Sequence, residues 1–133
     1  MVLYVDGGCS GNGQRDMTRR RMVMVVTDEA GVVLSEQQDT GGSNNIAELR
    51  AVRDALAWCR SHEVFEAEIR TDSRNNLAWV HGSKVGQLVN DREAVLDLKA
   101  RIARLREPME LRLTWVPREQ NIAGHYIEAK YGV

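Results

Sequence analysis

The chain has 133 residues and a formal net charge of −1 at pH 7. This length suits one domain and is too short for two hydrophobic cores of ordinary size, so we expect a single domain over residues 1–133. The balanced charge excludes a strong field over the whole protein for a polyanionic partner. Any contact with nucleic acid must therefore be local, which weighs against a pure binding module.

The cysteines and the N-terminus carry no sign of a metal motif or a targeting segment. Cys9 and Cys59 match neither a zinc-binding nor a CxxC spacing. The N-terminal "MVLYV" holds only five apolar residues before an aspartate, too few for a signal peptide or a membrane span. We therefore expect a monomeric protein in a reduced, cytoplasmic setting, without membrane association.

Three strands are predicted to open the domain. Residues 1–6 form a buried apolar run, and the glycine-rich "GGCSGNG" at 7–13 is typical of a loop. The runs 22–28 and 29–39 meet across a turn around Glu29 to Gly31, which predicts a hairpin.

From residue 45 the apolar period changes to that of a helix, predicted over residues 45–61. Asn45 and Glu48 are spaced as an N-cap and its capping-box partner. The residues on the apolar face are Ile46, Leu49, Val52, Leu56 and Cys59.

The rest of the chain alternates between strand and helix patterns. A strand is predicted over 64–72 and 109–116, and a helix over 73–82, 91–107 and 121–131. The order βββαβαβα, with one or two helices between the last two strands, favours an α/β fold. We expect a five-stranded mixed sheet with helices packed on its faces.

Three acids are predicted to converge at one edge of this sheet. Asp6 ends the first predicted strand and Asp72 ends the fourth, and open α/β sheets bind ligands at such strand ends. If those strands are parallel neighbours, the two carboxylates lie about 4.8 Å apart. Glu48 lies at the edge of the helix that turns towards the sheet, about 60° from the centre of its apolar face.

Each acid taken alone has a structural explanation, because an aspartate after a strand is usually a turn residue and Glu48 fits a capping box. Together, three carboxylates at matched positions would repel one another without a cation. Such oxygen-rich sites suit Mg²⁺ or Mn²⁺. The pattern therefore indicates phosphoryl-transfer chemistry.

Four segments in this order, "YVDGGCSGNG", "NNIAELRAV", "TDS" and "WVPREQN", resemble type 1 ribonuclease H, over the whole chain. The combination is specific, although each segment alone is weak. The resemblance implies a ribonuclease H-like fold with helices on both faces of the sheet. It also implies that Asp6, Glu48 and Asp72 are catalytic metal ligands.

The activity implied by this resemblance is endonucleolytic hydrolysis of the RNA strand of an RNA–DNA hybrid. Two divalent ions, Mg²⁺ or Mn²⁺, would activate the water and stabilise the leaving 3′ oxygen, and the product would carry a 5′ phosphate. Only the 2′-OH directly distinguishes RNA from DNA. The candidates for substrate contact are Gly7, Cys9, Ser10, Gly11, Asn12, Gln14, Asn44 and Asn45. Asn45 has the alternative role of a helix N-cap.

The sequence departs from the family where bacterial members often carry a basic, tryptophan-rich protrusion. The equivalent segment, 81–93, has Lys84 and Arg92 but no aromatic or basic cluster. The run Arg19–Arg21 would compensate if it meets backbone phosphates. Its alternative role is a solvated strand edge that resists aggregation.

The second departure is His125, which stands four residues after Asn121, where the family has its fourth metal-site acid. An imidazole there would be a metal ligand that favours Mn²⁺, or a proton shuttle near pH 7. The alternative is a half-exposed histidine without a chemical role. Glu128, on the same helical face, would partly supply the missing negative charge.

Three other classes of function stay open from the sequence. A weakened relative would bind hybrid or structured nucleic acid without cutting it, although three retained acids oppose that reading. Another nuclease on the same fold is possible because folds do not fix substrates. The third is an interaction domain of a larger polyprotein or reverse transcriptase.

Overall fold

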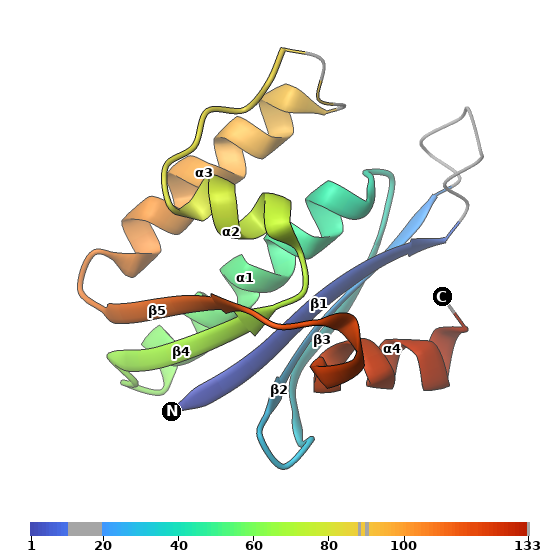
Figure 1. Cartoon of the computed structure of the whole chain (residues 1–133), viewed down its shortest axis with the longest axis vertical. Helices are drawn as coiled ribbons and strands as arrows, with labels where there is room; N and C mark the ends of the chain where they lie inside the picture. The colour runs from blue at the N-terminus through green and yellow to red at the C-terminus, as the bar shows by residue number, and fades with distance from the viewer. Residues whose placement is uncertain (11–19, 88, 90, 133) are drawn as a thin grey trace.

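The structure is a computed structural model, and it describes residues 1–10, 20–87, 89 and 91–132. Five strands form one mixed sheet in the order β3-β2-β1-β4-β5, which confirms the predicted fold class (Figure 1). The strands are β1 (Val2–Ser10), β2 (Arg21–Asp28), β3 (Val33–Thr40), β4 (Glu66–Thr71) and β5 (Glu110–Trp115). β1, β2 and β3 pair antiparallel, whereas β4 runs parallel to both β1 and β5.

Helices cover both faces of the sheet, as predicted. They are α1 (Asn44–Ser61), α2 (Arg74–Val80), α3 (Arg92–Arg106) and α4 (Ile122–Tyr131). The larger core lies between the sheet and the first three helices, and includes Leu49, Leu56, Ile69 and Ile102. A smaller core lies where α4 packs on the opposite face, and includes Val25 and Ile127. No helix within the described residues is long and apolar enough to cross a membrane.

β1 is longer than predicted, and this corrects two expectations. The strand continues through the glycines to Ser10, where it still pairs with Arg21 of β2. Asp6 therefore lies within β1 and not at its end, and residues 7–10 are strand and not loop. The glycine-rich composition was misleading because Gly7 serves a close approach to α1 here, in place of a turn.

The N-terminus of α1 also differs from the prediction. Ser43 is the N-cap, and its hydroxyl accepts a hydrogen bond from the amide of Ile46. The expectation that Asn45 caps the helix with Glu48 as its capping-box partner is therefore wrong. Both Ser and Asn are favoured caps, so the sequence alone did not separate these positions. The consequence is that the Glu48 carboxylate is not committed to a cap.

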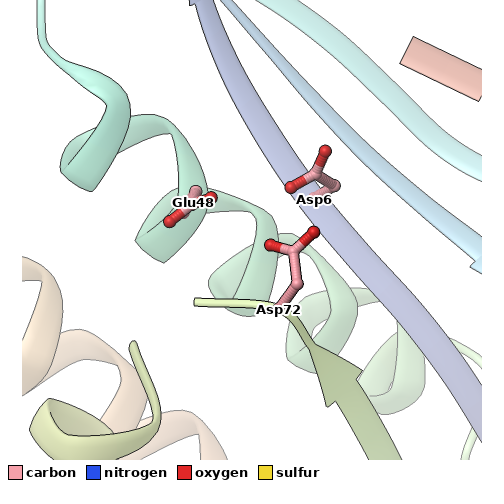
Figure 2. Close-up of side chains that lie close together, drawn as sticks. All are labelled: Asp6, Glu48 and Asp72. Atoms are coloured by element: carbon pink, nitrogen blue, oxygen red, sulfur yellow. The ribbon is translucent and has the colours of Figure 1, made fainter. Parts of the chain in front are cut away.

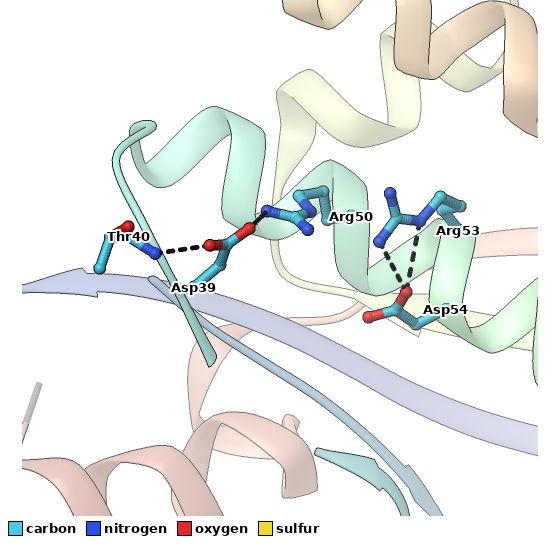
Figure 3. Close-up of polar contacts among 5 residues, drawn as sticks. All are labelled: Asp39, Thr40, Arg50, Arg53 and Asp54. Atoms are coloured by element: carbon cyan, nitrogen blue, oxygen red, sulfur yellow. Dashed lines mark hydrogen bonds and ion pairs between the residues drawn. The ribbon is translucent and has the colours of Figure 1, made fainter. Parts of the chain in front are cut away.

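Two ion pairs lie along α1, and one of them joins this helix to the edge strand β3 (Figure 3). Arg50 donates to the carboxylate of Asp39 on β3 at 2.8 Å. Arg53 donates to the buried Asp54, whose pKa is raised by burial and lowered again by that hydrogen bond. The pair between Arg50 and Asp39 therefore links α1 to the sheet at its exposed edge, whereas the pair between Arg53 and Asp54 lies within the helix.

Candidate active site

Three carboxylates from different elements meet at one end of the parallel strands. Asp6 lies within β1, Glu48 on α1 and Asp72 directly after β4. β1 and β4 are parallel neighbours with Tyr4 opposite Arg70, so Asp6 and Asp72 lie at the same level two residues further on. Each acid offers one oxygen, and these oxygens all lie within 4.8 Å of one another (Figure 2).

The close approach of α1 to β1 depends on Gly7. A Cβ added at this residue would lie 2.2 Å from the carbonyl carbon of Ala47 and 2.4 Å from the amide nitrogen of Glu48. No side chain fits there without moving the backbone of the helix. The absence of a Cβ at Gly7 therefore sets the distance between the elements that carry Asp6 and Glu48.

The α4 helix approaches the carboxylate of Asp6 from the face of the sheet opposite to α1. Asn121 is fully buried, donates to the carbonyl of Val5 at 3.0 Å and caps α4 by accepting from the amide of Gly124. A Cβ at Gly124 would lie 3.1 Å from Oδ2 of Asp6. One buried amide side chain thus joins the start of α4 to the strand residue that precedes Asp6.

Burial and mutual repulsion make it costly for these acids to be charged together. Burial first, and then the negative charges of Asp72 and Glu48, raise the pKa of Asp6 to about 8. Burial also raises the pKa of Glu48 to about 7, against the lowering effect of a hydrogen bond from Ser73. A divalent cation among the carboxylates would remove this repulsion. The ligand atoms are all oxygens, so the residues present fit Mg²⁺ or Mn²⁺.

The acids line a cleft of about 670 Å³. Its lining residues are Asp6, Gly7, Gly8, Cys9, Ser10, Asn44, Glu48, Asp72, Arg118 and Ile127. The structure therefore brings four predicted substrate-binding residues, Gly7, Cys9, Ser10 and Asn44, to the acids. Asn45 does not line the cleft, and its side chain accepts a hydrogen bond from Asn75. The predictions for Gly11, Asn12 and Gln14 lie outside the described residues, as does the one for Arg19.

His125 is exposed on α4 and is not a member of the described three-acid cluster. It directly follows Gly124, whose backbone lies against Asp6. Its role as a ligand or proton shuttle therefore stays a prediction. Glu128 does not stand free to replace the missing acid, because its carboxylate accepts two hydrogen bonds from Arg118, at 2.9 and 3.2 Å.

Three lining residues were not predicted from the sequence, Gly8, Arg118 and Ile127, and of these Arg118 carries a charge. It belongs to the short 3-10 turn Arg118–Gln120 between β5 and α4. Its positive charge lowers the pKa of both Asp6 and Glu48, although less than burial raises them. The segment "WVPREQN" contains Arg118, and this was the only hint of its role in the sequence. The position of a charged residue in a loop does not show which other residues it will lie beside in the fold. The cleft is therefore lined by one positively charged side chain, that of Arg118, as well as by three acids.

Comparisons with known proteins identify the family. The sequence model of the RNase H family matches residues 1–126. No curated protein sequence matches the chain. Similar solved structures include RNase H1 from the halophilic archaeon Halobacterium salinarum NRC-1, with 24% identity and a TM-score of 0.70, over 99% of this chain and 98% of that one.

Two further solved structures extend this likeness. The N-terminal RNase H domain of a Mycobacterium tuberculosis protein has 23% identity and a TM-score of 0.71, over 95% of each chain. LC11-RNase H1, isolated from compost by a metagenomic approach, has 27% identity and a TM-score of 0.65, over 95% of this chain and 90% of that one. Since the family match spans 126 of the 133 residues, the chain belongs to the ribonuclease H family.

Proposed function

We propose that this chain is an endonuclease that hydrolyses the RNA strand of RNA–DNA hybrids with two divalent ions and leaves a 5′ phosphate. Family and fold indicate cleavage of the RNA strand of hybrids. The observation that carries the proposal for this chain is the cluster of Asp6, Glu48 and Asp72 in one cleft. A relative with 26% identity, LC11-RNase H1, has been crystallised with an RNA/DNA hybrid, which supports the same substrate here.

The three acids are proposed to hold the metal, and Arg118 to balance the charge of the cleft. Bound divalent ions would activate a water for attack on the phosphorus and stabilise the leaving 3′ oxygen. The carboxylates must be deprotonated to bind a metal ion. Because the pKa values of Asp6 and Glu48 are raised, metal binding displaces protons from these two acids. Arg118 lines the cleft and also forms an exposed ion pair with Glu128 at 2.9 Å, so it brings a positive charge beside the acids.

Recognition of RNA is proposed to rest on the cleft wall formed by β1 and the start of α1. The backbone of residues 7–10 and the exposed side chain of Asn44 line the cleft beside the acids. Amide groups and backbone carbonyls there can donate to and accept from a 2′-OH, which is both donor and acceptor. Asn45, Gly11, Asn12 and Gln14 stay proposed contacts from the sequence alone.

His125 is proposed as the residue that sets the metal preference. Replacing the family's acid by a neutral imidazole removes one negative charge, which weakens the second ion more than the first and favours Mn²⁺ over Mg²⁺. The test compares hybrid cleavage in each metal for the parent, His125→Ala and His125→Asp. If neither substitution alters the rate or the metal dependence, His125 has no part in the reaction.

The substrate proposal is tested with end-labelled hybrid, single-stranded RNA, double-stranded RNA and DNA duplex, each incubated with Mg²⁺ or Mn²⁺. We expect internal cuts in the RNA strand of the hybrid and products that a 5′-phosphate-dependent exonuclease degrades. Binding of hybrid without any cut would favour the weakened relative instead. A monomeric state, a cytoplasmic setting and a single domain over residues 1–133 are also proposals from the sequence, and gel filtration tests the first.

A further inference from the structure

An arginine outside the cleft is held in place directly beside one of the three acids. Arg74 lies two residues after Asp72, at the first residue of α2, and it is exposed. Its guanidinium carbon lies 4.1 Å from the ring centroid of Trp115, a cation–π contact. Trp115 ends β5 and stands opposite Thr71, the last residue of β4. The pair therefore sits at the same strand ends as the acids.

The indole of Trp115 is itself fixed to the backbone of the acidic site. Its Nε1–H donates to the carbonyl oxygen of Asp72 at 3.2 Å. The ring is therefore locked by its edge to the residue whose carboxylate enters the cleft, and its face supports Arg74. Both a cation–π contact and a hydrogen bond restrict the rotamers of these long side chains before any ligand arrives.

Apart from its contact with the Trp115 ring, the charge of Arg74 has no ion-pair partner within the part of the chain that the structure describes. No ion pair joins Arg74 to a described acid, whereas Arg118 is paired with Glu128. Arg74 also does not line the cleft that holds the acids. Its guanidinium is therefore available to a group that extends beyond the cleft, past Asp72.

We propose that Arg74, held over Trp115, binds a backbone phosphate of the hybrid adjacent to the one that is cut, and that Trp115 is its positioning residue. This inference rests on the proposed function. A duplex is wider than the cleft, so its neighbouring phosphates must lie over the rim. Three carboxylates repel those phosphates, and a fixed cation beside Asp72 opposes that repulsion. The planar guanidinium also matches the geometry of a phosphate.

The inference is tested by the salt dependence of hybrid binding, measured by fluorescence anisotropy in a chelating buffer. Arg74→Gln is expected to weaken binding about tenfold, which corresponds to one charge-assisted hydrogen bond. It should also reduce the slope of log K against log salt by about 1, because one phosphate is no longer neutralised. Arg74→Lys keeps the charge, so it should retain the slope with weaker affinity. Arg112→Gln, three residues before Trp115 on β5 and with a side chain that is 78% exposed, is the matched control and should leave the slope unchanged.

The role of Trp115 is tested with two substitutions that differ in whether an aromatic face remains. Trp115→Phe keeps a ring under Arg74 and should bind hybrid within about twofold of the parent. Trp115→Leu removes the face and should weaken binding several-fold. Because Arg74 does not touch the reacting atoms, Arg74→Gln should lower kcat/KM and leave kcat unchanged at saturating hybrid. A merely structural role would lower the melting temperature and leave the salt slope as it is.

The outcomes separate this inference from the function on which it rests. An Arg74→Gln protein with the parent's salt slope, in a chain that does cut hybrid, overturns the phosphate contact alone. A parent that binds hybrid but cuts no substrate overturns the proposed activity and leaves the contact measurable by the same slopes. A parent that binds no hybrid overturns both.

Discussion

The contact between β1 and α1 at Gly7 predicts a large and specific effect of adding a single methyl group. In Gly7→Ala, the new Cβ would lie 2.2 Å from the carbonyl carbon of Ala47, whereas ordinary contacts begin at 3.4 Å. The strand and the helix must therefore separate by about 1.2 Å. Because the obstructing atoms are backbone atoms, no side-chain rotation can relieve the clash.

Two quantities should change together in Gly7→Ala. Overpacking of a core usually costs about 1–3 kcal/mol of unfolding free energy, and we expect about 3 because backbone must move. The same displacement carries Glu48 away from Asp6, and a shift of about 1 Å in a catalytic group can cost about 100-fold in rate. We therefore expect a folded but less stable protein whose hybrid cleavage is slower by about that factor.

The assay pairs urea unfolding with the initial rate of hybrid cleavage at a temperature where the variant is folded by circular dichroism. Gly86→Ala is the matched control, because its Cβ would meet only Cγ2 of Val89 at 3.7 Å, an ordinary contact. If Gly7→Ala cut hybrid at the parent's rate and unfolded within about 0.5 kcal/mol of it, the close approach would not set the geometry of the acids.

Three further predictions concern the surroundings of the site. Asn121→Ala should lose about 2 kcal/mol of unfolding free energy in urea, because it removes the cap of α4 and the side-chain hydrogen bond to the buried carbonyl of Val5. A loss below about 0.5 kcal/mol would contradict this. Glu36→Gln should cost about 1 kcal/mol at pH 7. Hydrogen bonds from Lys130, Tyr131 and Tyr126 lower the pKa of Glu36 from 4.5 to about 2, so its contribution is full above pH 4.5 and is lost as the pH falls towards 2. Unfolding at pH 3 should therefore show a smaller difference between variant and parent, and an equal difference at both pH values would refute the linkage. Mn²⁺ should raise the melting temperature of the parent more than that of Glu48→Gln, and equal shifts would place the ion elsewhere.

The elements with a clear period were predictable from the sequence. Apolar residues recur every three to four positions over α1, and this period identified the helix. The β-α-β order predicted a mixed sheet covered on both faces. The convergence of Asp6 and Asp72 followed from parallel pairing of β1 and β4, which the structure confirms. These features depend on local pattern and on rules of chain connection, which a single sequence carries.

The features that were missed depend on packing between distant residues. The glycines after Asp6 suggest a loop by composition. Only the short distance from Gly7 to Ala47 shows that Gly7 belongs to a strand on which a helix packs closely. The cap of α1 required a choice between Ser43 and its asparagine neighbours, which are equally good caps in isolation. The ion pair between Arg118 and Glu128 joins the turn before α4 to a residue of α4 itself. No repeating pattern in the sequence predicts such a pair.

The measurement that tests the central claim most directly is the initial rate of RNA cleavage in an RNA–DNA hybrid at saturating Mn²⁺, for the parent and for Asp72→Asn. The substitution keeps the size of the side chain and removes one of the three clustered negative charges. We predict metal-dependent cleavage by the parent and a loss of at least about 100-fold in the variant, because the site loses an anionic oxygen ligand. Equal rates for the two proteins would contradict the assignment of this cleft as the active site.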